Sequence, residues 1–253
     1  MGQNTRPLVS VITACLNAEE FLVETIESVL GQSYPHMEYI IIDGGSTDGT
    51  VEIIKRYANK LAYWHSQPDR GLAHAFNLGL SKAQGKWVLF LNADDYLFNS
   101  YVIENMVPYF KQNGDADVIF GQIAWASRQH EDYIKSFSIR GRPWRWRTFR
   151  FVCTIPHQSA FTRRKYFEAV GYFNEDLRIA MDYEIFLRRG PRLRAVFVPQ
   201  IISLMRSGGV SSNVIATLKE WRKAQILTRA TPNWLIWGNY LARFIWNMRG
   251  QDT

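Results

Sequence analysis

The sequence contains little cysteine: Cys15 and Cys153 are the two cysteines among its 253 residues. Two cysteines make no disulfide framework, and a reducing compartment suits them best. No uninterrupted apolar run reaches about 18 residues, so no membrane-spanning helix is expected. The first six residues also lack the apolar core of a signal peptide. These absences predict a cytoplasmic protein.

Several common ligand-binding motifs are missing as well. Neither Gly-x-Gly-x-x-Gly nor Gly-x-x-x-x-Gly-Lys-Ser/Thr occurs, which argues against dinucleotide dehydrogenases and P-loop enzymes. No cysteines and histidines have the spacing of zinc ligands. The candidate catalytic and metal-binding groups in this sequence are therefore carboxylates.

The net charge of +7 is unevenly distributed. Residues 1–139 carry 10 basic and 16 acidic side chains, residues 140–206 carry 14 and 5, and residues 207–253 carry 6 and 2. An acidic half beside a basic half suits a site where metal-binding carboxylates and anion-binding arginines converge. Two ordinary solvated surfaces would have the same distribution, so charge alone leaves both interpretations open.

The hydrophobic pattern predicts an α/β fold. Strands are expected at 8–12, 39–42, 62–65 and 87–91, and each is followed by a stretch with helical spacing. Because these strands are apolar on both faces, they indicate a mostly parallel sheet covered by helices on both sides. Asn17 is the expected N-cap of the first helix, and Ser46 or Thr47 that of the second.

Beyond residue 98 the pattern becomes mixed. Helices are expected at 101–112, 163–169 and 180–190, and short strands at 118–120, 133–139, 195–198 and 201–205. Two helices at 212–230 and 233–248 follow, with Pro232 between them.

Polar residues stand directly after each of the first four expected strands. Thr13 follows the first strand, Asp43 the second, residues 67–70 the third and residues 92–95 the fourth. Ligands of open α/β sheets bind beyond the carboxyl ends of the strands. The sequence therefore predicts a binding site at this edge of the sheet.

Two of these segments each have two interpretations. Asp94 and Asp95 are adjacent anions, which a divalent ion bound to a diphosphate would stabilise, but they could equally cap a turn. Residues 43–50 could form a backbone-lined cleft in which Asp43 accepts hydrogen bonds from a nucleobase, or a glycine-rich turn before a helix.

Taken together and in order, these segments resemble family 2 glycosyltransferases. The matching segments are VITACLN at 11–17, TIESVLGQS at 25–33, DGGSTDGT at 43–50, PDRG at 68–71 with Asn77, LNADD at 91–95, PHQSAF at 156–161 and MDYE at 181–184. The resemblance covers roughly residues 8–210. It implies a GT-A fold over residues 1–210, with a nucleotide-binding half at 1–98 and an acceptor-binding half at 99–210. Residues 211–253 would be a C-terminal helical extension.

The resemblance also assigns roles to individual residues. Asp43 would hold the nucleobase, and Asn92 would contact the ribose. Asp94 would bind a divalent Mn or Mg ion, and Asp182 would be the general base. The remaining residues expected at the nucleotide-sugar donor are Thr13, Asn17, Glu19, Ser46, Asp69, Arg70, Asn77 and Ala93.

The implied reaction is an inverting transfer of a sugar, from a UDP-linked donor, to a saccharide or lipid-linked saccharide in cell-surface polysaccharide synthesis. One carboxylate, Asp182, suffices to take the acceptor proton, whereas a retaining glycosidase needs two flanking carboxylates. Glu184 is expected on the opposite side of the helix turn and outside the chemistry. His157 either reaches the diphosphate or packs in the core.

The C-terminal half adds a basic, aromatic run, RPWRWRTFRF at 142–151. This pattern would suit phosphate contacts in nucleic acid or in a lipid diphosphate, or arginines lying over a domain seam. One face of the last expected helix combines Trp234, Trp237, Tyr240, Leu241, Phe244, Ile245 and Met248. That face either packs in the core or contacts the cytoplasmic face of the membrane peripherally.

Two alternative functions follow from these features. A sugar-nucleotide pyrophosphorylase shares the α/β nucleotide layout, but its glycine-rich arginine-lysine loop is missing near the start of the sequence. A non-enzymatic RNA- or lipid-binding module could be built on residues 140–151. The acidic first half argues against nucleic acid as a partner, because a duplex would be repelled across that surface.

Overall fold

The computed structural model describes residues 8–126, 137–206, 208 and 213–238. Its strands are β1 Val9–Cys15, β2 Met37–Asp43, β3 Tyr63–Ser66, β4 Trp87–Asn92, β5 Tyr96–Leu97, β6 Val118–Ala126, β7 Phe137–Arg140, β8 Ala160–Arg163 and β9 Ala195–Arg206. Its α-helices are α1 Leu22–Leu30, α2 Thr50–Tyr57, α3 Leu72–Lys82, α4 Val102–Gln112, α5 Trp146–Phe149, α6 Arg164–Val170, α7 Met181–Leu187 and α8 Val214–Thr228. Short 3-10 turns lie at Ala58–Lys60, His157–Ser159 and Gly190–Arg192.

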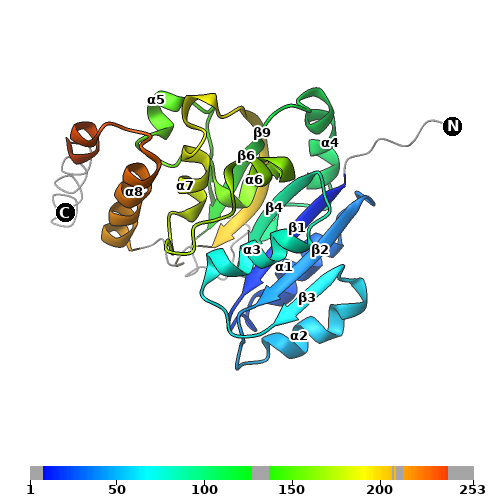
Figure 1. The fold of residues 1–253 in the computed structure, drawn as a ribbon. Helices are drawn as coiled ribbons and strands as arrows, with labels where there is room; N and C mark the ends of the chain where they lie inside the picture. The colour runs from blue at the N-terminus through cyan, green and yellow to red at the C-terminus, as the bar shows by residue number, and fades with distance from the viewer. Residues whose placement is uncertain (1–7, 127–136, 207, 209–212, 239–253) are drawn as a thin grey trace.

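The first half of the chain forms a parallel sheet, as the sequence predicts. β1 pairs in parallel with both β2 and β4, and β2 pairs in parallel with β3. All residues of β1 are buried, which agrees with a strand covered on both faces. The carboxyl ends of these strands therefore lie at the same edge of the sheet (Figure 1).

The second half extends the same sheet with mixed strand directions, in the order β3-β2-β1-β4-β8-β6-β9-β5. β8 is antiparallel to both β4 and β6, and β9 is parallel to β6. Two strands were expected at 195–198 and 201–205, but β9 is one strand with a register shift opposite Gln122. Pro199 falls within this irregularity, where a residue that cannot donate to the ladder is tolerated.

Helices cover both faces of the sheet around two buried clusters. Ile12, Phe76 and Phe90 belong to one cluster, which also holds the apolar residues of α6 and α7. Val11 and Ile26 belong to the other, to which α2 and α4 contribute. Alternate residues of β1 thus pack into opposite layers, as strand geometry requires. The predicted fold class is confirmed.

The predicted helix caps are wrong. Phe21 occupies the N-cap of α1 and Gly49 that of α2, and neither forms a side-chain capping bond. Asn17 instead adopts a positive φ of 50°, and the Ser46 hydroxyl is engaged with Asp43. Both predicted caps bind a neighbouring strand-end loop, a long-range contact that local propensity does not reveal.

The C-terminal helix α8 packs beside α7 (Figure 1). The Gln225 amide donates to the Tyr183 hydroxyl at 3.1 Å and to the Arg150 carbonyl at 2.8 Å. Trp234 and Trp237 follow this helix and are 73% and 55% exposed, so the two tryptophans do not pack in the core. Residues 239–253, with the rest of the expected aromatic face, lie outside the described residues. Among the described helices, none has the length and apolarity needed to cross a membrane.

Candidate functional site

The loops after β1 and β2 interlock through predicted site residues. Asn17 Oδ1 accepts from the Thr47 backbone N–H at 2.9 Å, and the Asn17 N–H donates to Ser46 Oγ at 2.7 Å. Glu19 Oε2 accepts from the Gly49 N–H at 2.7 Å. These contacts hold the two loops together at the carboxyl edge of the parallel strands.

Asp43 is fully buried at the centre of the second loop. Its Oδ2 accepts from the backbone N–H groups of Gly45 and Ser46, at 3.1 and 3.0 Å, and from Ser66 Oγ at 2.7 Å. Its Oδ1 accepts from the Ser46 hydroxyl. Asp43 therefore shapes the loop from within, and both of its carboxylate oxygens are engaged by the protein itself.

Thr13 and Ala93 also lie below the surface of this edge. The Thr13 side chain is fully buried in β1, where its hydroxyl accepts from the Tyr39 hydroxyl at 3.0 Å. Ala93 is buried, and its carbonyl accepts from Thr25 Oγ1 at 2.8 Å. Like Asp43, the Thr13 side chain therefore lies beneath the loops and not at their surface.

Asp69 lies against the loop after β2. Its Oδ1 accepts from the Gly71 N–H at 2.7 Å. A Cβ added at Gly44 would lie 2.8 Å from Asp69 Oδ2, so glycine at this position permits the close approach. Asp69 is thereby brought beside the Asp43 loop, where the resemblance expects the nucleotide pocket.

Arg70 and Asn77 link the two halves of the chain. Arg70 Nη2 forms an ion pair with Glu175 Oε2 at 2.6 Å. Asn77 Nδ2 donates to the Phe173 carbonyl at 3.0 Å, and Asn77 Oδ1 accepts from the Phe173 N–H at 2.9 Å. The sequence patterns did not point to Glu175, because its partners are about 100 residues away.

The turn after β4 concentrates negative charge. Asp95 is 1% exposed, and burial followed by the charge of Asp94 raises the pKa of its carboxyl. Asn92 Nδ2 donates to Asp95 Oδ2 at 3.1 Å, while the buried Asn92 Oδ1 has no hydrogen-bond partner among the described residues. The Arg206 N–H donates to Asp95 Oδ1 at 3.1 Å. Asp94 is half-buried beside this set.

Arg206, at the end of β9, holds this turn in place. Its Nη1 donates to the Asp94 carbonyl at 2.6 Å, and its Nη2 pairs with Glu24. The guanidinium lies 4.7 Å from the ring centroid of Phe21 and 5.1 Å from that of Tyr96. Sequence patterns gave no signal for Arg206, because the strand that carries it lies more than 100 residues beyond the turn.

This arrangement fits a divalent ion held jointly with a ligand. The described residues contain no group of three histidine, cysteine, aspartate or glutamate side chains that could hold a metal. Mg²⁺ is commonly bound by one or two carboxylates together with substrate phosphates, with no complete protein cage. The half-buried Asp94 and the unsatisfied Asn92 Oδ1 at the end of β4 are consistent with such an oxygen-rich site.

Asp182 is half-buried near the start of α7. Burial, with a smaller contribution from the negative charge of Glu220, raises the pKa of its carboxyl to about 6. The Tyr183 N–H donates to Asp182 Oδ1 at 2.7 Å and opposes this rise. A carboxylate with a pKa just below neutrality is suited to accept a proton at physiological pH.

Glu220 of α8 caps the chain that leads into α7. Its carboxylate accepts from three successive backbone N–H groups: Arg178 at 3.1 Å, Ile179 at 2.7 Å and Ala180 at 2.9 Å. The helical extension thus holds the segment that carries Asp182. Sequence patterns could not reveal this contact, because Glu220 lies about 40 residues further along the chain.

Glu184 and His157 occupy structural positions. Glu184 is 5% exposed, and both its carboxylate oxygens accept from Arg188 at 2.7 to 3.1 Å. The His157 ring packs 5.2 Å from Phe76 and 5.6 Å from Phe90, and burial lowers its pKa to about 4. Of the two interpretations of His157, the structure supports core packing.

A sequence model described as "Glycosyl transferase family 2" matches residues 10–171, which is more than half of the chain. The chain belongs to glycosyl transferase family 2. The match covers the interlocked loops and the turn after β4, whereas Asp182 and α8 lie beyond it.

Curated relatives of this family 2 glycosyltransferase are named as biosynthetic glycosyltransferases. A "PGL/p-HBAD biosynthesis glycosyltransferase" of Mycobacterium tuberculosis is 27% identical over 88% of this chain and 86% of its own length. The putative teichuronic acid biosynthesis glycosyltransferase TuaG of Bacillus subtilis is 44% identical over 36% of this chain and 38% of its own.

Solved structures confirm the GT-A fold. The S. aureus TarS 1–349 structure in complex with UDP-GlcNAc is similar, with a TM-score of 0.67 and 20% identity, over 87% of this chain and 65% of that one. The mannosyltransferase PcManGT of Pyrobaculum calidifontis, in complex with GDP-Man and Mn²⁺, has a TM-score of 0.68 and 20% identity, over 90% and 66% of the respective chains.

Proposed function

We propose that this family 2 glycosyltransferase moves a sugar from a UDP-linked donor to a hydroxyl of a saccharide or lipid-linked saccharide acceptor, with inversion at the anomeric carbon. The observation that carries the proposal is the placement of two half-buried carboxylates in separate surroundings. Asp94 lies in the turn that follows the parallel strand β4, and Asp182 is the second residue of α7 in the proposed acceptor half.

The donor would bind at the carboxyl edge of β1, β2 and β4. Asn17, Glu19, Ser46 and Asp69 form the loops there, and Asp43 supports them from within. Because both Asp43 oxygens accept bonds from its own loop, a base would be bound chiefly by the backbone that Asp43 orders. The complexes of TarS with UDP-GlcNAc and of PcManGT with GDP-Man support a nucleotide sugar as donor.

Asp94 would hold a divalent ion together with the donor diphosphate, and Asn92 would contact the ribose. When bound, the ion would supply positive charge to offset the charge that develops on the leaving diphosphate. Arg206 holds the backbone of this turn through the Asp94 carbonyl and so fixes the carboxylate that follows β4. The Mn²⁺ in the PcManGT complex supports a divalent ion.

Asp182 would accept the proton of the acceptor hydroxyl as that oxygen attacks the anomeric carbon. Its raised pKa, about 6, leaves it ionised and moderately basic at pH 7 to 8. A single attack on the face opposite the leaving group inverts the anomeric centre. Glu184 is engaged with Arg188, so it does not supply a second base.

The exposed Trp234 and Trp237 support peripheral contact with a membrane that carries the acceptor. Arg222 lies 4.5 Å from the Trp237 ring and places a cation beside it, as an anionic lipid surface would favour. On this proposal the enzyme acts at the cytoplasmic face of the membrane.

A thermal-shift panel tests the donor assignment, because a ligand that binds only the folded state raises the unfolding midpoint. The panel consists of UDP, GDP, dTDP and UMP, each with and without Mn²⁺. A second assay then measures the release of UDP from UDP-sugars. We expect UDP with Mn²⁺ to give the largest rise and UMP a small one. A panel in which no nucleoside diphosphate raises the midpoint, with or without metal, contradicts the proposal.

A further inference from the structure

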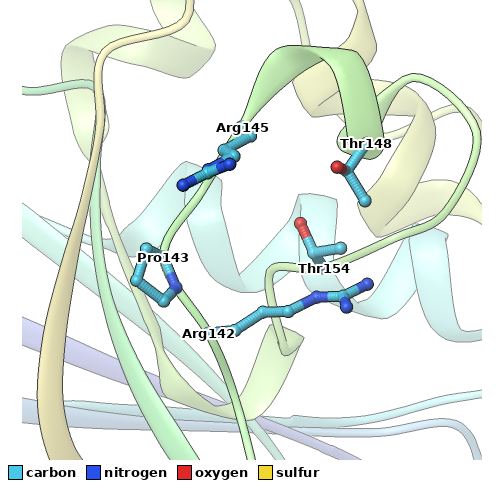
Figure 2. Close-up of a pocket in the computed structure, with 5 residues that line it drawn as sticks. All are labelled: Arg142, Pro143, Arg145, Thr148 and Thr154. Carbon is cyan, nitrogen blue, oxygen red and sulfur yellow. The ribbon is translucent and has the colours of Figure 1, made fainter.

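A basic pocket of about 310 Å³ lies outside the donor edge. It is lined by Arg142, Pro143, Arg145, Thr148 and Thr154. Figure 2 shows the hydroxyls of Thr148 and Thr154 directed toward the space that the two arginine side chains flank. Every polar side chain in this lining is a hydrogen-bond donor, and none is an obligate acceptor.

The two arginines have exposed side chains. Among the described residues, no carboxylate forms an ion pair with Arg142 or Arg145. By contrast, Arg188, Arg194 and Arg206 each pair with an acidic side chain. Two arginines that line one pocket without a carboxylate partner among the described residues favour a negatively charged ligand.

Thr154 gives an independent indication of a ligand. The residue is 9% exposed, and its Oγ1 is buried without a hydrogen-bond partner among the described residues. Buried hydroxyls are normally hydrogen-bonded, so an unpartnered one that lines a pocket indicates a missing acceptor. A phosphate oxygen between the arginines and Thr154 would satisfy it.

The pocket belongs to the acceptor side of the molecule. The Phe149 ring, between the two lining threonines in sequence, lies 5.3 Å from the Tyr183 ring, which is next to Asp182 on α7. Thr154 directly follows Cys153, whose thiol pKa is raised by burial and by the charge of Asp182. The segment that lines the pocket is therefore packed against α7, the helix that carries Asp182.

We propose that this pocket binds a phosphate group of the acceptor, so that the acceptor is a phosphate-bearing saccharide or lipid-linked saccharide. Arg142 and Arg145 neutralise the phosphate, and the Thr148 and Thr154 hydroxyls donate to its oxygens. The assignment of this phosphate to the acceptor rests on the proposed function. The binding of phosphate in the pocket does not depend on the proposed function. The other source of the same chemistry is the donor diphosphate.

The test measures binding of inorganic phosphate and glycerol phosphate to the full chain by calorimetry, in EDTA, so that no metal contributes. Thr154→Val removes the hydroxyl and keeps the shape, and Arg142→Gln with Arg145→Gln removes both charges. Arg147→Gln is the matched control, because Arg147 is an exposed arginine of the same segment outside the lining. Circular dichroism verifies that each variant is folded.

We expect the parental chain and Arg147→Gln to bind both probes alike, Thr154→Val to bind at least fivefold more weakly, and the double arginine variant to lose binding. Equal affinities in all four proteins, or no binding by the parental chain, overturn the proposal.

UDP with Mn²⁺ is then titrated into the same variants. Unchanged UDP affinity supports an acceptor phosphate, and a parallel loss assigns the pocket to the donor and overturns the proposal. If phosphate binds as expected but UDP never does, the donor assignment fails and the phosphate pocket remains.

Discussion

Replacing Asp182 by asparagine keeps the size of the side chain and an oxygen that can accept from the Tyr183 N–H, but removes the group that takes a proton. A base acts on the acceptor and need not touch the donor, so turnover should fall while donor affinity stays close to parental. We expect turnover at least about a hundredfold slower, the low end for loss of a positioned base.

The same substitution should stabilise the protein. Burial raises the pKa of Asp182 from 3.8 to about 6, so the folded state binds this proton more tightly than the unfolded state does. The carboxyl then contributes most stability below pH 4 and loses that contribution as the pH rises through 6. At pH 8 the ionised form costs up to about 3 kcal/mol, which the neutral amide avoids. The free energy of unfolding of Asp182→Asn at pH 8 should therefore be higher than that of the parental chain.

The assay combines three measurements on one variant: nucleotide release, UDP affinity by calorimetry, and urea unfolding at pH 5 and pH 8. Parental kcat/KM should fall about tenfold per pH unit below pH 6, and this dependence should disappear in Asp182→Asn. Asp176→Asn is the matched control, because Asp176 is exposed on the loop before α7. Full turnover in Asp182→Asn, or a loss equal to that of the control, would refute the reasoning.

Three further results are expected. Glu220→Ala removes the carboxylate that caps the segment before α7, so it should lower the free energy of unfolding by about 1–2 kcal/mol. It should also slow turnover more than it weakens UDP binding, and equal effects on turnover and UDP binding would contradict a positioning role. Glu184→Gln weakens a buried ion pair with Arg188, so it should lower the free energy of unfolding by about 3 kcal/mol and leave the pH profile of the remaining activity unchanged. A free energy of unfolding equal to that of the parental chain, measured in urea, would refute this prediction. Trp234→Ser with Trp237→Ser should reduce co-sedimentation with anionic vesicles and leave UDP affinity unchanged; undiminished sedimentation would remove these tryptophans from a membrane surface.

Most of the fold could be predicted from the sequence, because its main elements are locally encoded. β1 and β4 are mostly apolar strands, and α1 has regular helical spacing. β5, β8 and α5 were not predicted, since they span only two to four residues and are stabilised by pairing or packing with distant segments. Residues 239–248 of the expected last helix lie outside the described part of the chain.

The candidate site divides in the same way. The resemblance pointed to the Asp94 turn and to Asp182, because each lies in a short segment with a recognisable pattern, and the roles of both residues stay predictions. Arg206 and Glu220 were missed, since each acts on backbone groups about 40 to 110 residues away. The sequence left two interpretations of the Asp43 segment open, because the hydrogen bonds of Asp43 depend on Ser66 and on the fold of the loop.

Calorimetric titration of UDP with Mn²⁺ tests the central claim most directly, because the claim requires Asp94 to join the protein to the donor through a divalent ion. The parental chain should bind UDP with Mn²⁺ and bind it far more weakly in EDTA. Asp94→Ala should lose the manganese-dependent part. Asp115→Ala, which removes an exposed aspartate from a surface pair with Arg194, should match the parental chain. Unchanged manganese-dependent affinity in Asp94→Ala would contradict the account.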